Sequence, residues 1–253
     1  MNKPFLVFGM QRTGTTLLIR IIKSYATRRS AGHNRISEYF GSQYTIIDNN
    51  ITLEGKFRDK PDCPDQLRNN EIIERIEKLK KYKDQKIPIK ILSSQITDTI
   101  FNYVKNRYLI ILIERREKYD QLLSFLIAKQ DDIWNVWNVP ITALLKPTPR
   151  FSANLKLIDE FFEAQLLYQK WKEEFLRMSA IDVTIVYYED LIAKNNYKTV
   201  IEKIGINYDN RNIKNLPKKL HSFHEKKKII INIEEVKQYY TIKIFKGGCR
   251  QKS

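Results

Sequence analysis

Long apolar runs are missing from this sequence of 253 residues. A membrane-spanning helix needs roughly 18 to 20 consecutive apolar residues, and no run in the chain approaches that length. The N-terminal run at 5–8, FLVF, is too short for the core of a signal peptide. We therefore expect a cytoplasmic protein without a transmembrane segment.

Cysteine, glycine and proline are also scarce, with 2, 8 and 8 residues respectively. Cys63 and Cys249 lie far apart in the sequence and lack metal-ligand spacing, so neither a disulfide framework nor a zinc site is indicated. The low glycine and proline content excludes a low-complexity chain. The length and the hydrophobic fraction of 42% suit one globular domain over 1–253, within which 215–253 has no clear assignment.

The charge balance is strongly basic, with a formal net charge of +16. Such a charge suits nucleic acid, an anionic membrane surface or a polyanionic small substrate, and it does not choose among them. In 72–86, IIERIEKLKKYKDQK, lysines alternate with acids as on the solvated face of a helix. None of the recognised nucleic-acid motifs is present, so we expect no specific nucleic-acid partner.

Four short runs rich in β-branched and aromatic residues predict buried parallel strands. Helical patterns at 14–26, 117–130 and 190–205 follow the first, third and fourth runs. This alternation predicts an α/β fold in which helices flank a central parallel sheet. The predicted strands are Phe5–Phe8, Ile87–Leu92, Tyr108–Ile113 and Val183–Tyr188.

Two further segments carry weaker patterns. A long helix is expected at 152–178, with Leu155, Ile158, Phe162, Leu166 and Trp171 facing the core. The run at 228–233 is rich in isoleucine and predicts an edge strand.

The most informative segment joins the first strand to the first helix. Gly9 and Gly14 have the G-x-x-x-x-G spacing of a phosphate-binding loop, in which backbone N–H groups and a helix N-terminus converge on an anion. Thr15 stands where the nucleoside triphosphate loop has its lysine, which argues against an ordinary kinase or ATPase. Arg12 instead brings a cation into the loop, and Thr13, Thr15 and Thr16 add hydroxyl donors.

The residues QRTGTTLL at 11–18 resemble the 5′-phosphosulfate loop of sulfotransferases that use 3′-phosphoadenosine 5′-phosphosulfate (PAPS). The resemblance implies a P-loop NTPase-like sulfotransferase fold and a donor site in this loop. Arg12 is then expected to act in catalysis as well as in binding. The loop residues implied in donor binding are Gln11, Arg12, Thr13, Gly14, Thr15 and Thr16.

A second motif in ILIERREKYDQLLSF resembles the 3′-phosphate motif of that family, Arg-x-x-x-Asp-x-x-x-Ser. Ser124 lies eight residues after Arg116, and Asp120 falls between them. The spacing favours Arg116 as the ligand, while Arg115 remains an alternative. Tyr188, in a segment similar to the family's strand and helix near the adenosine, is expected beside the nucleotide or in the core.

In the cytosolic branch of that family the general base is a histidine on a central strand, and the matching strand here keeps Lys90 but has no histidine, so another group must serve as base. The segment SAGHNRISEYFG resembles the bacterial carbohydrate branch that includes trehalose sulfotransferases, in which a glutamate serves as base. On this sequence that residue is Glu38, with His33 as a weaker alternative. Lys90 is expected to neutralise charge on the bridging oxygen, and no metal is required.

These expectations define a sulfotransferase that moves a sulfuryl group from PAPS to an acceptor hydroxyl and releases 3′,5′-adenosine bisphosphate (PAP). The branch that the segment around Glu38 resembles implies a small-molecule or carbohydrate acceptor. The rings of Trp134 and Trp137 could stack on sugar faces or pack in the core. A P-loop kinase for nucleotides or small molecules and a non-enzymatic polyanion binder remain the alternatives.

Overall fold

The computed structural model describes residues 3, 5–26, 43–48, 51–56, 73–74, 77, 89–131, 149–178, 183–193, 197–205 and 223–250. The chain forms two compact units, each built from two separate stretches of sequence. The first unit comprises Met1–Glu114 and Leu167–Leu216, and the second comprises Arg115–Leu166 and Pro217–Ser253.

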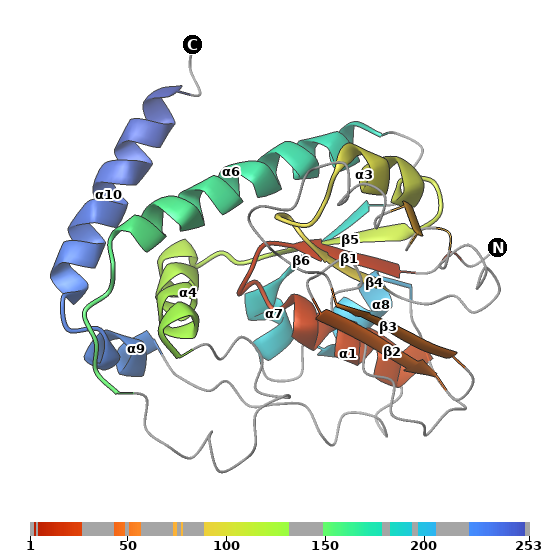
Figure 1. The fold of residues 1–253 in the computed structure, drawn as a ribbon, viewed down its shortest axis with the longest axis horizontal. Coiled ribbons are helices and arrows are strands. Elements are labelled where there is room, and N and C mark those ends of the chain that lie inside the picture. Colours follow the sequence, from red (N-terminus) through yellow and green to blue (C-terminus); the bar gives the residue numbers. More distant parts are fainter. Residues whose placement is uncertain are drawn as a thin grey trace. The chain divides into compact units, whose positions relative to one another are not determined.

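The first unit contains a parallel sheet of four strands in the order β4-β1-β5-β6 (Figure 1). Val7 at the centre of β1 pairs with Lys90 on one side and with Ile111 on the other. Strands β1, β4 and β5 are almost entirely buried, as expected for a parallel sheet that is covered on both faces. All four predicted strands are confirmed to within two residues at each end: β1 (Phe5–Gly9), β4 (Ile89–Leu92), β5 (Leu109–Glu114) and β6 (Val183–Tyr187).

Helices cover both faces of this sheet. Helices α1 (Thr15–Ala26), α7 (Tyr188–Ile192) and α8 (Tyr197–Lys203) lie on one face. Their apolar side chains form one buried cluster with the strands: Val7, Leu18, Ile19, Ile21, Ile22, Ile111, Ile113, Val186, Leu191, Val200, Ile201 and Ile204.

Aromatic rings fill the opposite face, under α3 (Asp98–Val104) and the second half of α6 (Lys156–Arg177). The Phe8 ring on β1 stacks on Tyr168 at 5.5 Å between centroids and contacts Phe175 at 5.2 Å. Phe101 of α3 joins the same group through Phe175 at 5.0 Å. Each such ring pair stabilises the fold by about 0.5–1.5 kcal/mol in addition to the burial of its apolar surface. Helices therefore pack on both faces of the sheet, as the α/β prediction requires.

Several elements of the first unit differ from the sequence prediction. The helical segment predicted at 190–205 is broken, because α7 ends where Ala193 becomes extended (φ −62°, ψ 137°). The predicted stop at Gly205 is confirmed by its left-handed φ of 76°. Helix α3 and an antiparallel hairpin of β2 (Gln43–Asp48) and β3 (Ile51–Lys56) were not predicted.

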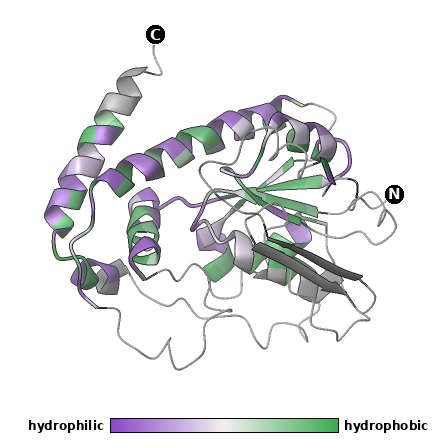
Figure 2. Cartoon of the chain, in the orientation of Figure 1, coloured by the Kyte–Doolittle hydropathy of each residue, from purple (hydrophilic) through white to green (hydrophobic). Residues whose placement is uncertain are grey.

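The second unit is helical. It contains α4 (Lys118–Asp131), the first half of α6, α9 (Phe223–Ile229) and α10 (Ile233–Arg250). Phe125 of α4 packs on Phe161 of α6 with 5.8 Å between ring centroids. The Tyr240 ring of α10 contacts Tyr119 and Phe162. Figure 2 shows polar and apolar residues alternating along α6, as expected for a helix with one packed side.

Two predictions in this unit are wrong. The segment 228–233 is not a strand, because it is divided between the end of α9, a turn and the start of α10. Only Ile230 makes a bridge, to Phe151, and Asn232 bonds both backbone groups of Ala153 instead of extending a ladder. Leu166 is 64% exposed, although its helical spacing placed it in the core.

Candidate functional site

The predicted phosphate loop lies at the carboxyl end of β1, between that strand and α1. Strand β4, which follows β1 in the sheet, lies beside β1 at one edge, and β5 is then added on the opposite edge of β1. In open α/β sheets such a reversal marks the usual ligand site. The Ser93 N–H donates to the Gly9 carbonyl at 3.0 Å, which ties the end of β4 to the start of the loop.

The loop backbone is strained at the position of its cation. Among the described residues, Arg12 is the one non-glycine residue with a positive φ, at 62°, and Gly14 follows at 90°. A left-handed conformation costs an ordinary residue about 1–2 kcal/mol. Strain of this kind is kept where the surrounding structure and the function require it, so the loop is a functional candidate on its backbone alone.

Both loop glycines are required by close packing. A Cβ on Gly9 would lie 2.7 Å from Ile113 Cγ2 and from Thr15 Cγ2. A Cβ on Gly14 would lie 2.5 Å from Cδ2 of Tyr188. The structure therefore brings Tyr188, expected near the nucleotide, directly against the loop.

The three threonines of the loop have different surroundings. Thr13 is buried, and its hydroxyl donates to the Met10 carbonyl at 2.6 Å, which closes the turn. Thr15 is buried at the start of α1. The Thr16 hydroxyl accepts a hydrogen bond from Lys90 Nζ at 3.0 Å. Gln11 and Arg12 are partly exposed.

Lys90 is the second cation at this loop. It lies on β4, 74 residues from Thr16 in sequence, and only 4% of it is exposed. Lysine is rarely buried so deeply without a polar partner. A buried ammonium group beside the N-terminus of α1 creates a positive region that favours an anion.

A carboxylate that the sequence analysis missed lies at the end of β5. Glu114 Oε1 accepts a hydrogen bond from the Tyr168 hydroxyl at 3.3 Å and pairs with Lys172 Nζ at 2.5 Å. Burial, and secondarily the charge of Glu114, raises the pKa of Tyr168. These contacts attach the second half of α6 to β5. Glu114 is the last residue of an otherwise apolar strand, and this position is the sequence signal that could have identified it.

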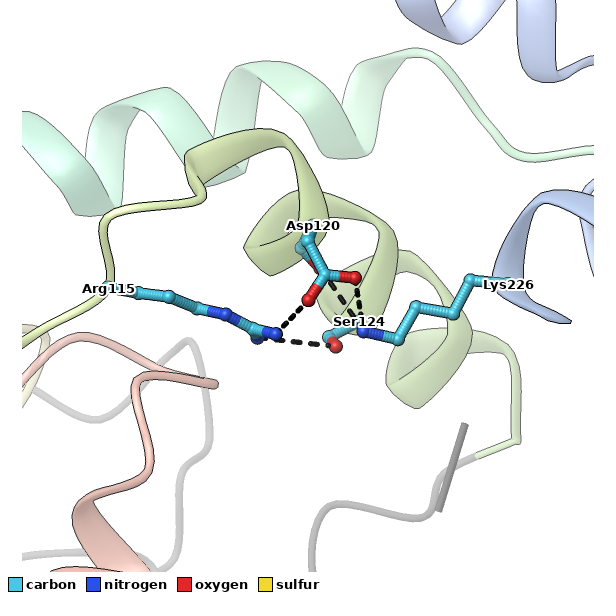
Figure 3. A network of polar contacts seen from close by, with 4 residues as sticks. All are labelled: Arg115, Asp120, Ser124 and Lys226. Atoms are coloured by element: carbon cyan, nitrogen blue, oxygen red, sulfur yellow. Dashed lines mark hydrogen bonds and ion pairs between the residues drawn. The ribbon is translucent and has the colours of Figure 1, made fainter. Parts of the chain in front are cut away.

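The motif that the sequence predicts to bind a 3′-phosphate lies in the second unit and forms a buried network (Figure 3). Arg115 Nη2 pairs with Oδ2 of Asp120, and Arg115 Nη1 lies 3.5 Å from the Ser124 hydroxyl. Lys226 Nζ of α9 lies 2.6 Å from Asp120 Oδ1. Each of the four residues is less than 10% exposed.

The structure brings Arg115, and not Arg116, to Ser124. Arg116 is exposed in the turn between β5 and α4, whereas Arg115 is 3% exposed. The eight-residue spacing pointed to Arg116, but the path of the chain out of β5 turns the preceding arginine toward α4. Lys226 was also missed, because its 106-residue separation from Asp120 leaves no local sequence signal.

Several predicted residues lie outside the described part of the chain. They include Glu38, His33, Trp134 and Trp137. Within the described ranges, no three His, Cys, Asp or Glu side chains are grouped so as to hold a metal ion. No helix in those ranges has both the length and the apolar composition needed to cross a bilayer.

Comparison with known proteins adds no assignment. The sequence matches no protein-family model and no curated protein.

Proposed function

We propose that this protein is a sulfotransferase that uses PAPS as donor. The observation that carries the proposal is the loop between β1 and α1 at the switch point of a parallel sheet. This loop lacks the lysine of nucleoside triphosphate loops, and it has Arg12 within it and Lys90 hydrogen-bonded to Thr16. Together with the resemblance of QRTGTTLL, this set of cations suits a phosphosulfate.

The donor is divided between the two motifs in this proposal. The loop residues 11–16 bind the 5′-phosphosulfate through backbone N–H groups, Arg12 and the hydroxyls. The motif of the second unit binds the 3′-phosphate, with Ser124 and either Arg115 or Arg116 as donors. Each assignment rests on the residues of its own unit.

The reaction is an in-line transfer of the sulfuryl group. The acceptor oxygen forms a bond to sulfur while the bond between sulfur and the bridging phosphate oxygen breaks, and PAP leaves. Glu38 takes the hydroxyl proton. Lys90 stabilises the negative charge that develops on the bridging oxygen. The carbohydrate acceptor follows from the branch that the Glu38 segment resembles.

The proposal is tested by calorimetric titration of the purified protein with PAP, 5′-AMP and ATP, without magnesium. PAP should bind at least about tenfold more tightly than 5′-AMP, because a charge-assisted contact to the 3′-phosphate is worth more than a neutral hydrogen bond. Arg115→Met and Arg116→Met form a matched pair that removes one guanidinium each. The contact of Arg115 with Ser124 predicts that only Arg115→Met lowers the preference for PAP.

Other outcomes have equally definite meanings. Loss of the preference in Arg116→Met alone would assign the 3′-phosphate to the residue that the spacing favours. Equal binding of PAP and 5′-AMP, with ATP bound tightly once magnesium is added, would reject the sulfotransferase and favour a kinase.

A further inference from the structure

Lys226 lies in the C-terminal stretch of the chain and is far in sequence from both motifs. It is on α9, and 4% of it is exposed. The neighbouring Lys227 and Lys228 on the same helix are exposed. Burial of one lysine in a run of three requires a specific partner, since a buried ammonium group is costly without one.

The partner is the carboxylate of Asp120. Lys226 Nζ lies 2.6 Å from Oδ1 of Asp120 and 3.5 Å from the backbone carbonyl of the same residue. Arg115 pairs with the other carboxylate oxygen, Oδ2. One carboxylate therefore holds two cations, one on each oxygen, and Figure 3 shows them approaching it from different elements.

This arrangement concentrates donors around the start of α4. Ser124 follows Asp120 by one helical turn and lies 3.5 Å from Arg115 Nη1. A guanidinium group, an ammonium group and a hydroxyl thus converge on one buried region, with Asp120 fixing the two charged heads. These are the donor types that bind a phosphate monoester.

We propose that Lys226 is a third residue of the 3′-phosphate site, supplied by α9 and held in place by Asp120. This inference rests on the proposed use of PAPS. Its consequence is that α9 is part of the 3′-phosphate site and contributes to the choice of a 3′-phosphorylated nucleotide.

The test compares Lys226→Met with Lys228→Met by calorimetric titration with PAP and with 5′-AMP. Both substitutions remove one positive charge from α9, but Lys228 is exposed. Lys226→Met should lower the ratio of PAP to 5′-AMP affinity about tenfold or more. Lys228→Met should leave the ratio within about threefold, because an exposed charge is screened. Lys226→Arg should restore most of the ratio.

A purely structural role gives a different result. It would weaken PAP and 5′-AMP alike and leave their ratio at the wild-type value, and that outcome would overturn the inference while the donor proposal stands. Equal affinity of the wild type for the two nucleotides would overturn both.

A second variant covers the case in which Lys226→Met fails to fold. Lys226→Gln also removes the positive charge, but its amide keeps a donor for Asp120, and Arg115 still pairs with the other carboxylate oxygen. The ratio should fall in this variant too, and a wild-type ratio in the folded Lys226→Gln variant would contradict the role of Lys226.

Discussion

At the scale of single residues, two glycines share a backbone conformation and differ in surroundings. Gly14 and Gly205 both have a positive φ, at 90° and 76°. A Cβ on Gly14 would meet the Tyr188 ring, whereas a Cβ on Gly205 would have no atom of the described residues within 4 Å. Alanine substitutions at these two glycines therefore distinguish the cost of the left-handed backbone from the cost of a clash with the Tyr188 ring.

We expect Gly205→Ala to lower the free energy of unfolding by about 1 kcal/mol, the cost of a left-handed alanine. Gly14→Ala carries that cost and also displaces the Tyr188 ring, so its loss should be about 2–4 kcal/mol. Urea denaturation followed by circular dichroism measures both. Tyr188→Ala in the Gly14→Ala background should recover much of the difference. Equal losses in the two alanine variants would show that the ring does not constrain the loop.

At the scale of elements, one carboxylate attaches α10 to α6. Asp159 accepts a hydrogen bond from the Tyr239 hydroxyl at 3.1 Å and pairs with Lys243 Nζ at 2.5 Å. The hydrogen bond to Lys243 lowers the pKa of Asp159, and the same bond raises the pKa of Lys243. Both side chains are more than one third exposed, so water weakens the pair.

These directions define a pH window for the attachment of α10. Because the pKa of Asp159 is lowered, its contribution is present above its unfolded value of about 4 and is lost as the pH falls through the folded pKa. Because the pKa of Lys243 is raised, its contribution is present below about pH 10.4 and is lost as the pH rises through the folded pKa. Asp159→Asn should therefore lower the urea midpoint slightly. This gap between the midpoints of wild type and variant should be widest near neutral pH and should disappear below about pH 4.

A control variant identifies the source of that gap. When Tyr239 and Lys243 are replaced by Phe and Gln, Asp159 has lost both of these partners. Adding Asp159→Asn to this variant should then have no pH-dependent effect on the midpoint. A gap that stays constant from pH 3 to pH 7 in the wild-type background would contradict the role of this carboxylate.

The strands of the sheet could be predicted because each is a compact apolar run, and burial on both faces leaves a signal within the run itself. The same reasoning failed at 228–233, where Ile229–Ile231 resemble a strand but end one helix and lead into another. Helix α3 was missed because it is short. Its signal was Thr97, whose hydroxyl accepts a hydrogen bond from the Ile100 N–H at the helix start.

The candidate site divides in the same way between local and distant information. The loop residues could be predicted because their chemistry lies within eight consecutive positions. The contacts of Lys90 with Thr16 and of Lys226 with Asp120 join residues 74 and 106 positions apart, and spacing carries no information about such pairs. Which of Arg115 and Arg116 contacts Ser124 depends on the path of the chain after β5, and the periodicity of the sequence does not define that path.

At the scale of the whole molecule, the two units are interleaved in sequence. The second unit needs Arg115–Leu166 and the C-terminal stretch from Pro217, whereas every residue of the first unit precedes Pro217. Ile230 bridges Phe151, and Lys226 pairs with Asp120. Both contacts join the two stretches of the second unit.

A chain that ends at Leu216 should therefore keep the first unit and lose the second. In hydrogen exchange we expect β1 and β5 to remain protected, because their partners β4 and β6 are still present. The amides of α4 should exchange much faster than in the full chain, since Asp120 has lost Lys226. Unchanged protection of α4 in the shortened chain would contradict this division.

The strand order also has a consequence during synthesis on the ribosome. Strand β5 ends at Glu114, and its outer neighbour β6 does not begin until Val183. At about 5–20 residues per second, β5 waits several seconds for that neighbour. Throughout this interval the nascent chain exposes an unpaired, strongly apolar strand edge, the feature that promotes aggregation. Productive expression should then depend on chaperone supply and on the translation speed of the codons between these two strands.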